Sequence, residues 1–433
     1  GITHTILERE RLTLGATTLA QVLKGAGYAT GIFGKWHLGD EAAYRPDARG
    51  FDEVFIHGAG GIGQTYPGSC GDAPGNKYFD PAILHNGTFE KTKGYCTDVF
   101  FEQARKWIAA TKGKQPFYCH LATNAPHGPY IARPEDRALY EGKNLGADVE
   151  NFFGMIHNID ENVGRLLAHL DTLGIARDTL VVFMNDNGGT AGVKVFNAGM
   201  HGSKGSPWIG GVRAISFWRW PGKLQPGDCG ALTAHMDFFR TVAALAGAPL
   251  DDGLQRQSAE ARSLLPLLAD PKASWEDRFL YHHAGRWPKG TNPDLAKERN
   301  CAVRNTQYTL VSEGARPGAQ GGAAPSGWQL FDVIADPAQS KDIAAEKPEV
   351  VAKLKAAYDG WWASLKGQYD VNEAVLGPKL NPFAELYWKQ FGGGPTEADY
   401  QRMDPEKAKT FEAGRGKAAS TKGKGKGKGK AGG

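Results

Sequence analysis

Residues 17–39 read TTLAQVLKGAGYATGIFGKWHLG, and this stretch decides the fold. Its first eight residues begin with two threonines and repeat apolar side chains at helical spacing, which predicts a helix that the following glycines end. Residues 28–33 are rich in strand-forming side chains and predict a strand that ends at Lys35. We therefore expect Lys35 and His37 at the carboxyl end of a strand that follows a helix.

Two further apolar runs, residues 117–123 and 179–184, predict buried strands. Between them, residues 152–170 place apolar side chains three and four apart, which predicts an amphipathic helix. Alternating helices and strands predict an α/β fold with a mostly parallel central sheet flanked by helices, whose ligand sites gather at the carboxyl ends of the strands. His127 and Asp186 follow these two runs closely, so both are expected at that edge of the sheet.

The pattern changes after about residue 270, where short strand candidates are separated by turn residues. They lie at residues 279–282, 301–304, 308–311 and 328–331. They predict a small antiparallel sheet, followed by an amphipathic helix near residues 348–365. We expect a large α/β domain over residues 1–270, a small-sheet subdomain over 271–385, and a C-terminal extension over 386–433.

The formal charge of +4 comes from the C-terminal tail. Seven Lys and Arg residues lie between Arg415 and Lys430, and removing their seven charges from +4 leaves the rest of the chain at −3. A nucleic-acid-binding protein needs a basic face on its folded body, so the composition argues against a nucleic-acid partner. We expect the Gly/Lys repeat to be a solvated, disordered appendage. No run of 18 apolar residues occurs, so the sequence predicts no transmembrane segment.

The five cysteines are widely spaced and form no C-x-x-C pair, which argues against a zinc site with the usual cysteine spacing. Cys70 and Cys96 lie among loop residues, and they are candidates for a disulfide bridge. The odd number of cysteines does not indicate the compartment.

Four short segments combine glycines with charged or imidazole groups. They are GKWHLG at 34–39, NAPH at 124–127, NDNG at 185–188 and GSKG at 202–205. Lys35 and His37 are two residues apart, so on an extended segment both would project to the same side and could reach one anion. In this order and at these distances, together with GFD at 50–52 and WQLFD at 328–332, the segments closely resemble the sulfatase family of the alkaline phosphatase-like superfamily.

This resemblance covers roughly residues 12–345, and it implies hydrolysis of sulfate monoesters, including those of sulfated carbohydrates. It implies a nucleophile made by oxidising a cysteine or serine upstream of the Lys-Trp-His segment to formylglycine. The roles that it implies are sulfate binding for Lys35, a hydrogen bond to the formylglycine hydroxyl for His37, sulfate contact or protonation of the leaving oxygen for His127, and bridging of sulfate and leaving oxygen for Lys204.

The resemblance also implies a calcium ion, with Asp186 and Asn187 as the later pair of its ligands. Carboxylate and amide oxygens are the donors that Ca²⁺ prefers, so the residue types agree with this assignment. Taken alone, the Asn-Asp-Asn-Gly segment would be an ordinary turn at the end of a strand. The other histidines that we considered, His120, His157 and His235, have no such support, and we assign them to packing or to the surface.

The nucleophile itself has no counterpart here, because neither Cys-x-Pro-x-Arg nor Ser-x-Pro-x-Arg occurs in the sequence. The two N-terminal acidic metal ligands and an arginine of the family pattern are also unmatched, and a further family contact cannot be assigned within residues 57–61. We therefore expect residues 1–270 to be a sulfatase catalytic domain that lacks its N-terminal part, and the 433-residue chain to be inactive alone.

Two alternatives remain open. One is a phosphodiesterase or phosphonate hydrolase on the same scaffold, and the other is a catalytically inactive protein that binds sulfated glycans. For the sulfatase, the resemblance implies a sulfated small-molecule or glycan substrate and a formylglycine-generating enzyme as maturation partner. It also implies a periplasmic or secreted location.

Overall fold

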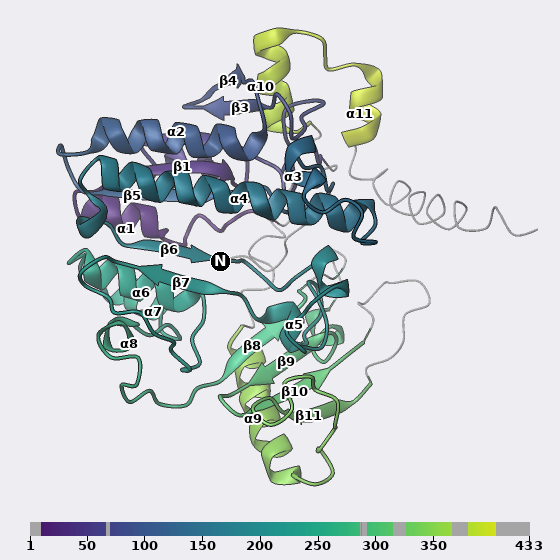
Figure 1. Cartoon of the computed structure of the whole chain (residues 1–433). Helices are drawn as coiled ribbons and strands as arrows, with labels where there is room; N and C mark the ends of the chain where they lie inside the picture. Colours follow the sequence, from purple (N-terminus) through teal and green to yellow (C-terminus); the bar gives the residue numbers. More distant parts are fainter. Residues whose placement is uncertain are drawn as a thin grey trace, which may run out of the picture.

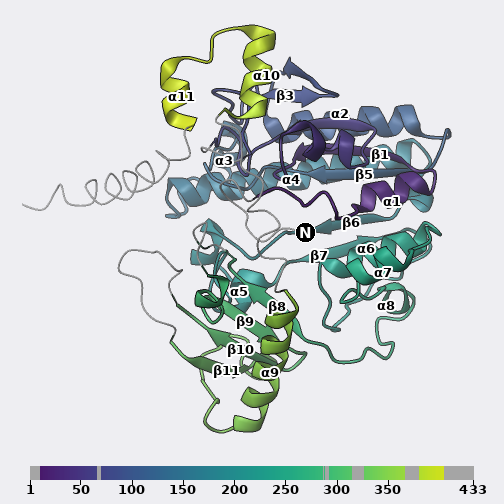
Figure 2. The ribbon, with the colours of Figure 1, turned by 180° about the vertical axis from the view of Figure 1, so that it is seen from behind.

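The computed structural model describes residues 10–65, 70–285, 287, 292–314, 326–365 and 380–403 (Figure 1). The Gly/Lys-rich tail, for which we expect disorder, lies outside these residues. The views from the front and from behind both show the β1 to β5 region with its helices in the upper part of the molecule, and the strands β8 to β11 with α9 in the lower part (Figures 1 and 2).

The predicted first helix and strand are confirmed. Helix α1 (Leu19–Gly25) begins with a capping box, in which the Thr18 side chain accepts a hydrogen bond from the Gln21 backbone and the Gln21 side chain accepts one from the Thr18 backbone. Strand β1 (Ala29–Lys35) follows, and all its residues except Lys35 are buried. Lys35 therefore lies at the edge of the core, at the end of a buried strand.

Strand β1 lies inside a five-stranded sheet with the order β4-β3-β2-β1-β5. The other strands are β2 (Glu53–His57), β3 (Ala82–His85), β4 (Thr88–Lys91) and β5 (Phe117–Ala122). Strands β2 and β5 both pair with β1 in parallel, whereas β3 and β4 extend the sheet as an antiparallel hairpin. The carboxyl ends of β1, β2 and β5 therefore meet at one edge.

Two long helices cover one face of this sheet, α2 (Cys96–Thr111) and α4 (Ala147–Thr172). Helix α4 contains the predicted amphipathic segment and packs against α2, which in turn packs on β1 and β5. Phe33, Phe100 and Met155 are fully buried in the shared core. This helical layer fixes the position of the sheet edge that carries the site.

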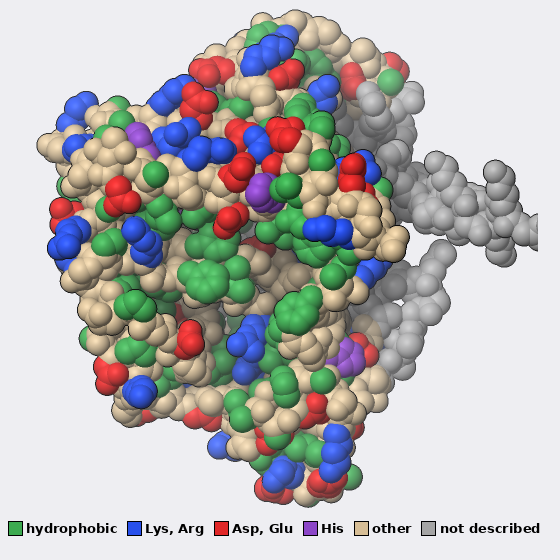
Figure 3. All heavy atoms as spheres, viewed as in Figure 1, with side chains coloured by type: hydrophobic (Ala, Val, Ile, Leu, Met, Phe, Trp, Pro, Cys, Tyr) green, Lys and Arg blue, Asp and Glu red, His purple; other side chains and the backbone are tan. Residues whose placement is uncertain are grey.

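The strand predicted at residues 179–184 forms as β6 (Val181–Met184), but its partner is β7 (Ser216–Arg219) in a separate two-stranded antiparallel sheet. Val181 packs in the same cluster as Phe117 and Cys119 of β5, so β6 lies near β5. Within the described part of the chain, however, no backbone ladder joins β5 to β6. Both strands keep half-buried apolar side chains. In the space-filling view, hydrophobic side chains surround a hollow in the middle of the face seen in Figure 1 (Figure 3).

The small C-terminal sheet is confirmed and has the order β11-β10-β9-β8, with antiparallel pairs throughout. Its strands are β8 (Leu280–His283), β9 (Cys301–Arg304), β10 (Tyr308–Ser312) and β11 (Trp328–Asp332). Helix α9 (Pro348–Ser364) packs its buried Leu354, Tyr358 and Trp362 on this sheet. The chain is therefore an α/β protein with a second, smaller antiparallel sheet.

Shorter helices complete the described structure. They are α3 (Pro134–Ala138), α5 (Ile209–Val212), α6 (Met236–Leu245), α7 (Asp252–Gln257), α8 (Leu265–Ala269), α10 (Pro382–Phe391) and α11 (Glu397–Met403). The 3₁₀ turns are η2 (Ala42–Tyr44), η3 (Asp47–Arg49), η4 (Ala176–Asp178), η5 (Ala191–Lys194) and η6 (Pro293–Leu295).

The boundary expected between residues 385 and 386 falls inside α10, whose Phe383 packs against Phe89 of β4. Cys70 and Cys96 are both buried as free thiols, so the proposed bridge between them is wrong. None of the helices in the described ranges has the length and hydropathy needed to cross a bilayer.

Candidate active site

Lys35, the last residue of β1, lies at the centre of a charged cluster at the carboxyl edge of the sheet. Burial lowers the pKa of its ammonium group; Asp186 acts in the opposite direction, and Lys204 lowers the pKa further. Glu10 is a second nearby carboxylate that raises it. The fold thus brings together three residues that the sequence placed in separate segments, 35, 186 and 204.

His37 lies just beyond the end of β1, where the backbone changes direction. Its φ is 58°, so the segment is not extended here, and our expectation that Lys35 and His37 project from one extended segment is wrong. The His37 backbone N–H donates to the Gly58 carbonyl at 3.0 Å, which fixes this turn against the end of β2. The His37 Nε2 lies 2.8 Å from Glu10 Oε2. A Cβ on Gly60 would lie 2.6 Å from the imidazole, so the ring packs directly on glycine backbone.

A buried polar scaffold holds this turn in place. The second carboxylate oxygen of Glu10 accepts a hydrogen bond from the Cys70 backbone N–H. Asp40 Oδ2 accepts hydrogen bonds from the Gly71 backbone N–H at 3.0 Å and from the Asn381 side chain at 2.6 Å. Burial raises the pKa of Asp40 to about 7. The sequence does not indicate that Glu10 and Asp40 belong to the site, because neither is part of a periodic pattern or of a matched motif.

His57 is a third imidazole at this edge, and the sequence reading left it unassigned. It ends β2 directly beside Lys35 in the sheet register, and it is fully buried. Neither of its ring nitrogens has a hydrogen-bond partner among the described residues, and Asp72 Oδ2 lies 3.6 Å from Nδ1. Burial lowers the pKa of His57 to about 3, and Lys35 and His37 act in the same direction. His57 is therefore a neutral ring beneath the site at physiological pH.

His127 belongs to the loop that follows β5 and lies in the same electrostatic cluster. Its backbone carbonyl accepts the Tyr78 hydroxyl at 2.6 Å, and its Nδ1 lies 2.8 Å from the Gly128 carbonyl oxygen. Because a carbonyl only accepts, we assign the proton to Nδ1, which leaves Nε2 for a ligand. Burial lowers the pKa of His127, the contact with Gly128 opposes this, and Lys204 and Lys35 lower it further.

The loops after β6 carry Asp186, Asn187 and Lys204. The Lys204 backbone N–H donates to the Gly189 carbonyl at 2.9 Å, which ties the Gly-Ser-Lys-Gly loop to the Asn-Asp-Asn-Gly loop. The Asn187 side-chain N–H donates to the Gly188 carbonyl at 2.8 Å, so this contact leaves the side-chain oxygen available as a ligand. Asp186 and Lys204 are both exposed.

The donor types of Asp186 and Asn187 fit a hard cation such as Ca²⁺, which takes six to eight oxygen ligands. These two residues supply only part of such a set. Within the described residues, Asp186 does not belong to any convergent group of three His, Cys, Asp or Glu donors. The chemistry of the pair is therefore suitable, but a complete ion site needs further oxygen ligands.

This arrangement is suited to binding a tetrahedral anion. Lys35 and Lys204 both act electrostatically on His127, and each of the three groups is placed by a different segment. Fixed cations in a partly buried site stabilise negative charge on a ligand more strongly than they would in water. The predicted residues Lys35, His127, Asp186 and Lys204 are brought together, and His37 joins them through Glu10.

Comparisons with known proteins agree with this geometry. A family model described as Sulfatase matches residues 1–248. The uncharacterized sulfatase YdeN of Escherichia coli K12 is 26% identical over 400 residues, which cover 80% of this chain and 66% of the relative. Mouse arylsulfatase J is 26% identical over 387 residues, which cover 82% of this chain and 64% of the relative. The chain thus matches slightly less than two thirds of the length of these curated relatives.

The solved structure of Ps i-CgsB in complex with k-i-k-neocarrahexaose has the same fold, with a TM-score of 0.67 and 24% identity over 92% of this chain and 84% of that one. The family model covers more than half of the sequence, and it includes every segment that contributes to the charged cluster. The chain belongs to the sulfatase family.

Proposed function

We propose that this protein hydrolyses sulfate monoesters and that its substrate is a sulfated carbohydrate. The observation that carries the proposal is that Lys204 and Asp186 both act electrostatically on Lys35 and on His127 at the carboxyl edge of the sheet. A sulfate ester is a tetrahedral anion that builds up further charge on its leaving oxygen, and such a pocket favours both. The carbohydrate part of the proposal draws support from Ps i-CgsB, whose structure contains a hexaose.

The residues of this chain have distinct roles in the proposed reaction. Lys35 binds a sulfate oxygen from the buried side, and Lys204 approaches from an exposed loop, where it balances charge on the leaving oxygen. His127 presents Nε2 to the ester. An anionic ligand opposes the lysine repulsion that lowers the His127 pKa, so substrate binding favours the protonated ring that can donate to the leaving oxygen.

His37 and Glu10 form a close pair at the proposed site. The Glu10 carboxylate is almost fully buried, and its oxygen lies 2.8 Å from His37 Nε2. A carboxylate in this position orients the ring, as in other catalytic histidine pairs. We propose that His37 hydrogen-bonds the hydroxyl of the nucleophile and that Glu10 keeps the ring in position.

Asp186 and Asn187 would hold a calcium ion, which supplies polarisation of the sulfate when it is bound. The nucleophile would be a formylglycine, made by a separate maturing enzyme. Because the 433 residues contain neither form of the modification motif, we propose that the nucleophile comes from a segment outside this sequence. Within the described residues, β5 and β6 pack near each other without a backbone ladder between them, which supports its arrival on a strand that inserts there.

Calcium calorimetry tests the metal part of the proposal. The protein is prepared with the upstream segment, stripped of metal and titrated with Ca²⁺. Asp186→Ala should abolish high-affinity binding because it removes a charged ligand, whereas Asn187→Ala removes only a neutral oxygen and should weaken binding less. Asp178→Ala is the matched control, since this exposed carboxylate lies just before β6, at the opposite end of the strand from Asp186. If Asp186→Ala binds calcium as tightly as the parent, the Asn-Asp-Asn-Gly segment is only a turn.

Turnover distinguishes the reaction class. The same protein should release sulfate from a sulfated sugar and should show much lower kcat/KM with the matched phosphate ester. Faster hydrolysis of the phosphate ester would overturn the assignment. Saturable binding of the sulfated sugar with no release of sulfate by a protein shown to contain formylglycine would overturn hydrolysis itself.

A further inference from the structure

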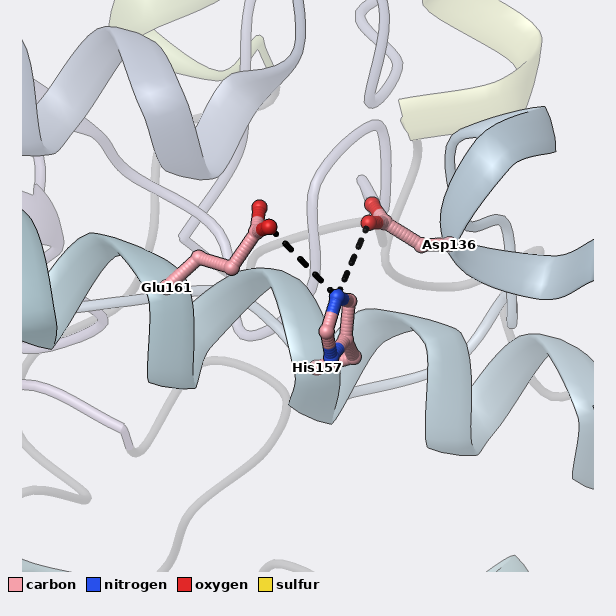
Figure 4. A group of neighbouring side chains, drawn as sticks. All are labelled: Asp136, His157 and Glu161. Atoms are coloured by element: carbon pink, nitrogen blue, oxygen red, sulfur yellow. Dashed lines mark ion pairs between the residues drawn. The ribbon is translucent and has the colours of Figure 1, made fainter. Parts of the chain in front are cut away.

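A histidine and two carboxylates converge at the junction of α3 and α4. Asp136 belongs to α3, and His157 and Glu161 lie one helical turn apart on α4. One donor atom from each of the three residues lies within 4.8 Å of the other two. The close-up shows His157 Nε2 directed toward both carboxylates (Figure 4), at 3.5 Å from Glu161 Oε1 and 3.9 Å from Asp136 Oδ1.

We propose that these three residues form a binding site for a divalent transition metal of the Zn²⁺ class. The two separations are too long for hydrogen bonds. Zinc–ligand bonds of about 2.0–2.2 Å in a tetrahedron put neighbouring donors roughly 3.3–3.5 Å apart. The two His157 separations therefore need only small inward movements, whereas the Asp136 and Glu161 donors, which lie within 4.8 Å of each other, must approach by up to about 1.4 Å. An imidazole nitrogen with two carboxylate oxygens suits zinc and related ions better than calcium, which prefers an all-oxygen set.

Arg133 orients the two carboxylates without occupying the donor atom of Glu161. It contacts Glu161 through Oε2 at 3.0 Å, which leaves Oε1 directed at the imidazole. It also holds both oxygens of Asp136, at 2.6 Å from Oδ2 and 2.8 Å from Oδ1. Hydrogen bonds of this kind commonly fix the ligating carboxylates of metal sites.

The charge around the site is also suitable for a dication. Four carboxylates surround the two guanidinium groups of Arg133 and Arg165, so with a neutral imidazole the group carries two excess negative charges. These carboxylates are Asp98, Glu135, Asp136 and Glu161. In the space-filling view, acidic, basic and histidine side chains gather at the surface over α4 (Figure 3). His157 and Glu161 are partly exposed, so an ion can reach the site from solvent.

This site is separate from the proposed catalytic one. None of its three residues is among the charges that act on Lys35, His57 or His127. A metal here would connect the short helix α3, which follows the His127 loop, to the long helix α4. We therefore expect it to stabilise the fold rather than to take part in turnover.

Zinc calorimetry on the chelator-treated 433-residue protein, without an affinity tag, tests the proposal. All variants are built in an Asp186→Ala background, so that the proposed calcium site cannot contribute. The parent should bind one equivalent of Zn²⁺ and melt at a higher temperature with zinc than without it. His157→Ala should lower the affinity by at least the ~10–100-fold that is lost when even an outer partner of a ligand is removed.

Glu161→Gln should weaken binding similarly, and it serves as a second variant if His157→Ala does not fold. Asp160→Asn is the matched control, because it neutralises an exposed carboxylate on the same helix beside Glu161. It should bind zinc like the parent. Equal zinc affinity in the parent, His157→Ala and Glu161→Gln would overturn the proposal, as would an equal loss in Asp160→Asn. Failure of calcium binding at Asp186 would leave these results unchanged.

Discussion

Replacing Asp40 by asparagine should change how the stability of the protein depends on pH. The Asp40 carboxyl is fully buried, and burial raises its pKa from 3.8 to about 7, with Glu41 acting in the same direction. Its Oδ2 accepts hydrogen bonds from Gly71 and Asn381, while Oδ1 has no hydrogen-bond partner among the described residues. An asparagine oxygen can keep both of these contacts, but it cannot ionise.

The sign and the size of the effect follow from the raised pKa. Below pH 3.8 the carboxyl is protonated in both the folded and unfolded protein, so it contributes no pH dependence there. As the pH rises from 3.8 to about 7, only the unfolded protein loses this proton, and stability falls. At about 1.4 kcal/mol per pKa unit, the loss is roughly 1.6 kcal/mol at pH 5 and roughly 4 kcal/mol at pH 8.

Denaturant unfolding at pH 5 and pH 8 measures this difference. The stability of Asp40→Asn relative to the parent should increase by about 2.5 kcal/mol between the two pH values, whatever the constant cost of the new amide. Comparing the two pH values removes that constant cost. Asp47→Asn is the control, since Asp47 is exposed, and it should leave the pH dependence of the parent unchanged. The same pH dependence in the parent and in Asp40→Asn would refute the reasoning.

Three further predictions concern the site and its support. In a protein that contains the nucleophile, three substitutions should each lower kcat about 100-fold without changing the circular dichroism spectrum, because they remove groups that act on transition-state charge: Lys35→Ala, His37→Ala and Lys204→Ala. Wild-type turnover in one variant would remove that residue from the site. Gly34→Ala should destabilise the protein by at least ~2 kcal/mol, because φ is 121° and the new Cβ would clash with the Ala122 backbone of β5; an unchanged melting temperature would contradict this. In an NMR titration, the ring of His57 should stay neutral down to about pH 4, whereas His85 should titrate above its ordinary 6.5, because hydrogen bonds to Glu90 and Glu53 outweigh its partial burial. The reverse order of titration would show that the local environments are misassigned.

The main elements of the fold could be predicted because their signals are local. The threonine start and apolar spacing before Gly25 are sufficient to indicate α1, and the three-and-four spacing along α4 indicates a helix with one buried face. The order of motifs also located the edge of the sheet where Lys35 and Asp186 meet. These features depend on neighbouring residues along the chain, so a single sequence contains them.

The parts that were missed depend on packing between distant segments. His57 ends an apolar strand and looks like any other histidine until the register places it beside Lys35. Glu10 contacts His37, which lies 27 residues later in the chain, and no sequence spacing indicates that contact. The turn at His37 has a positive φ without a glycine, which sequence rules do not anticipate. Likewise, His157 shows no pattern until α3 brings Asp136 against it.

If the nucleophile arrives on a strand between β5 and β6, as proposed above, activation and stability are thermodynamically linked, because no backbone ladder joins these two strands within the described residues. Such a strand would pair with backbone groups of β5 and β6 and cover the half-buried side chains of β6, and these contacts exist only in the native state. Any substitution that destabilises the folded arrangement of β5 and β6 would then raise the concentration of inserting peptide that turnover requires, even if it touched no catalytic group. A synthetic strand supplied in trans would serve both as a folding ligand and as a switch, and its dose would set the melting temperature and the reaction rate together.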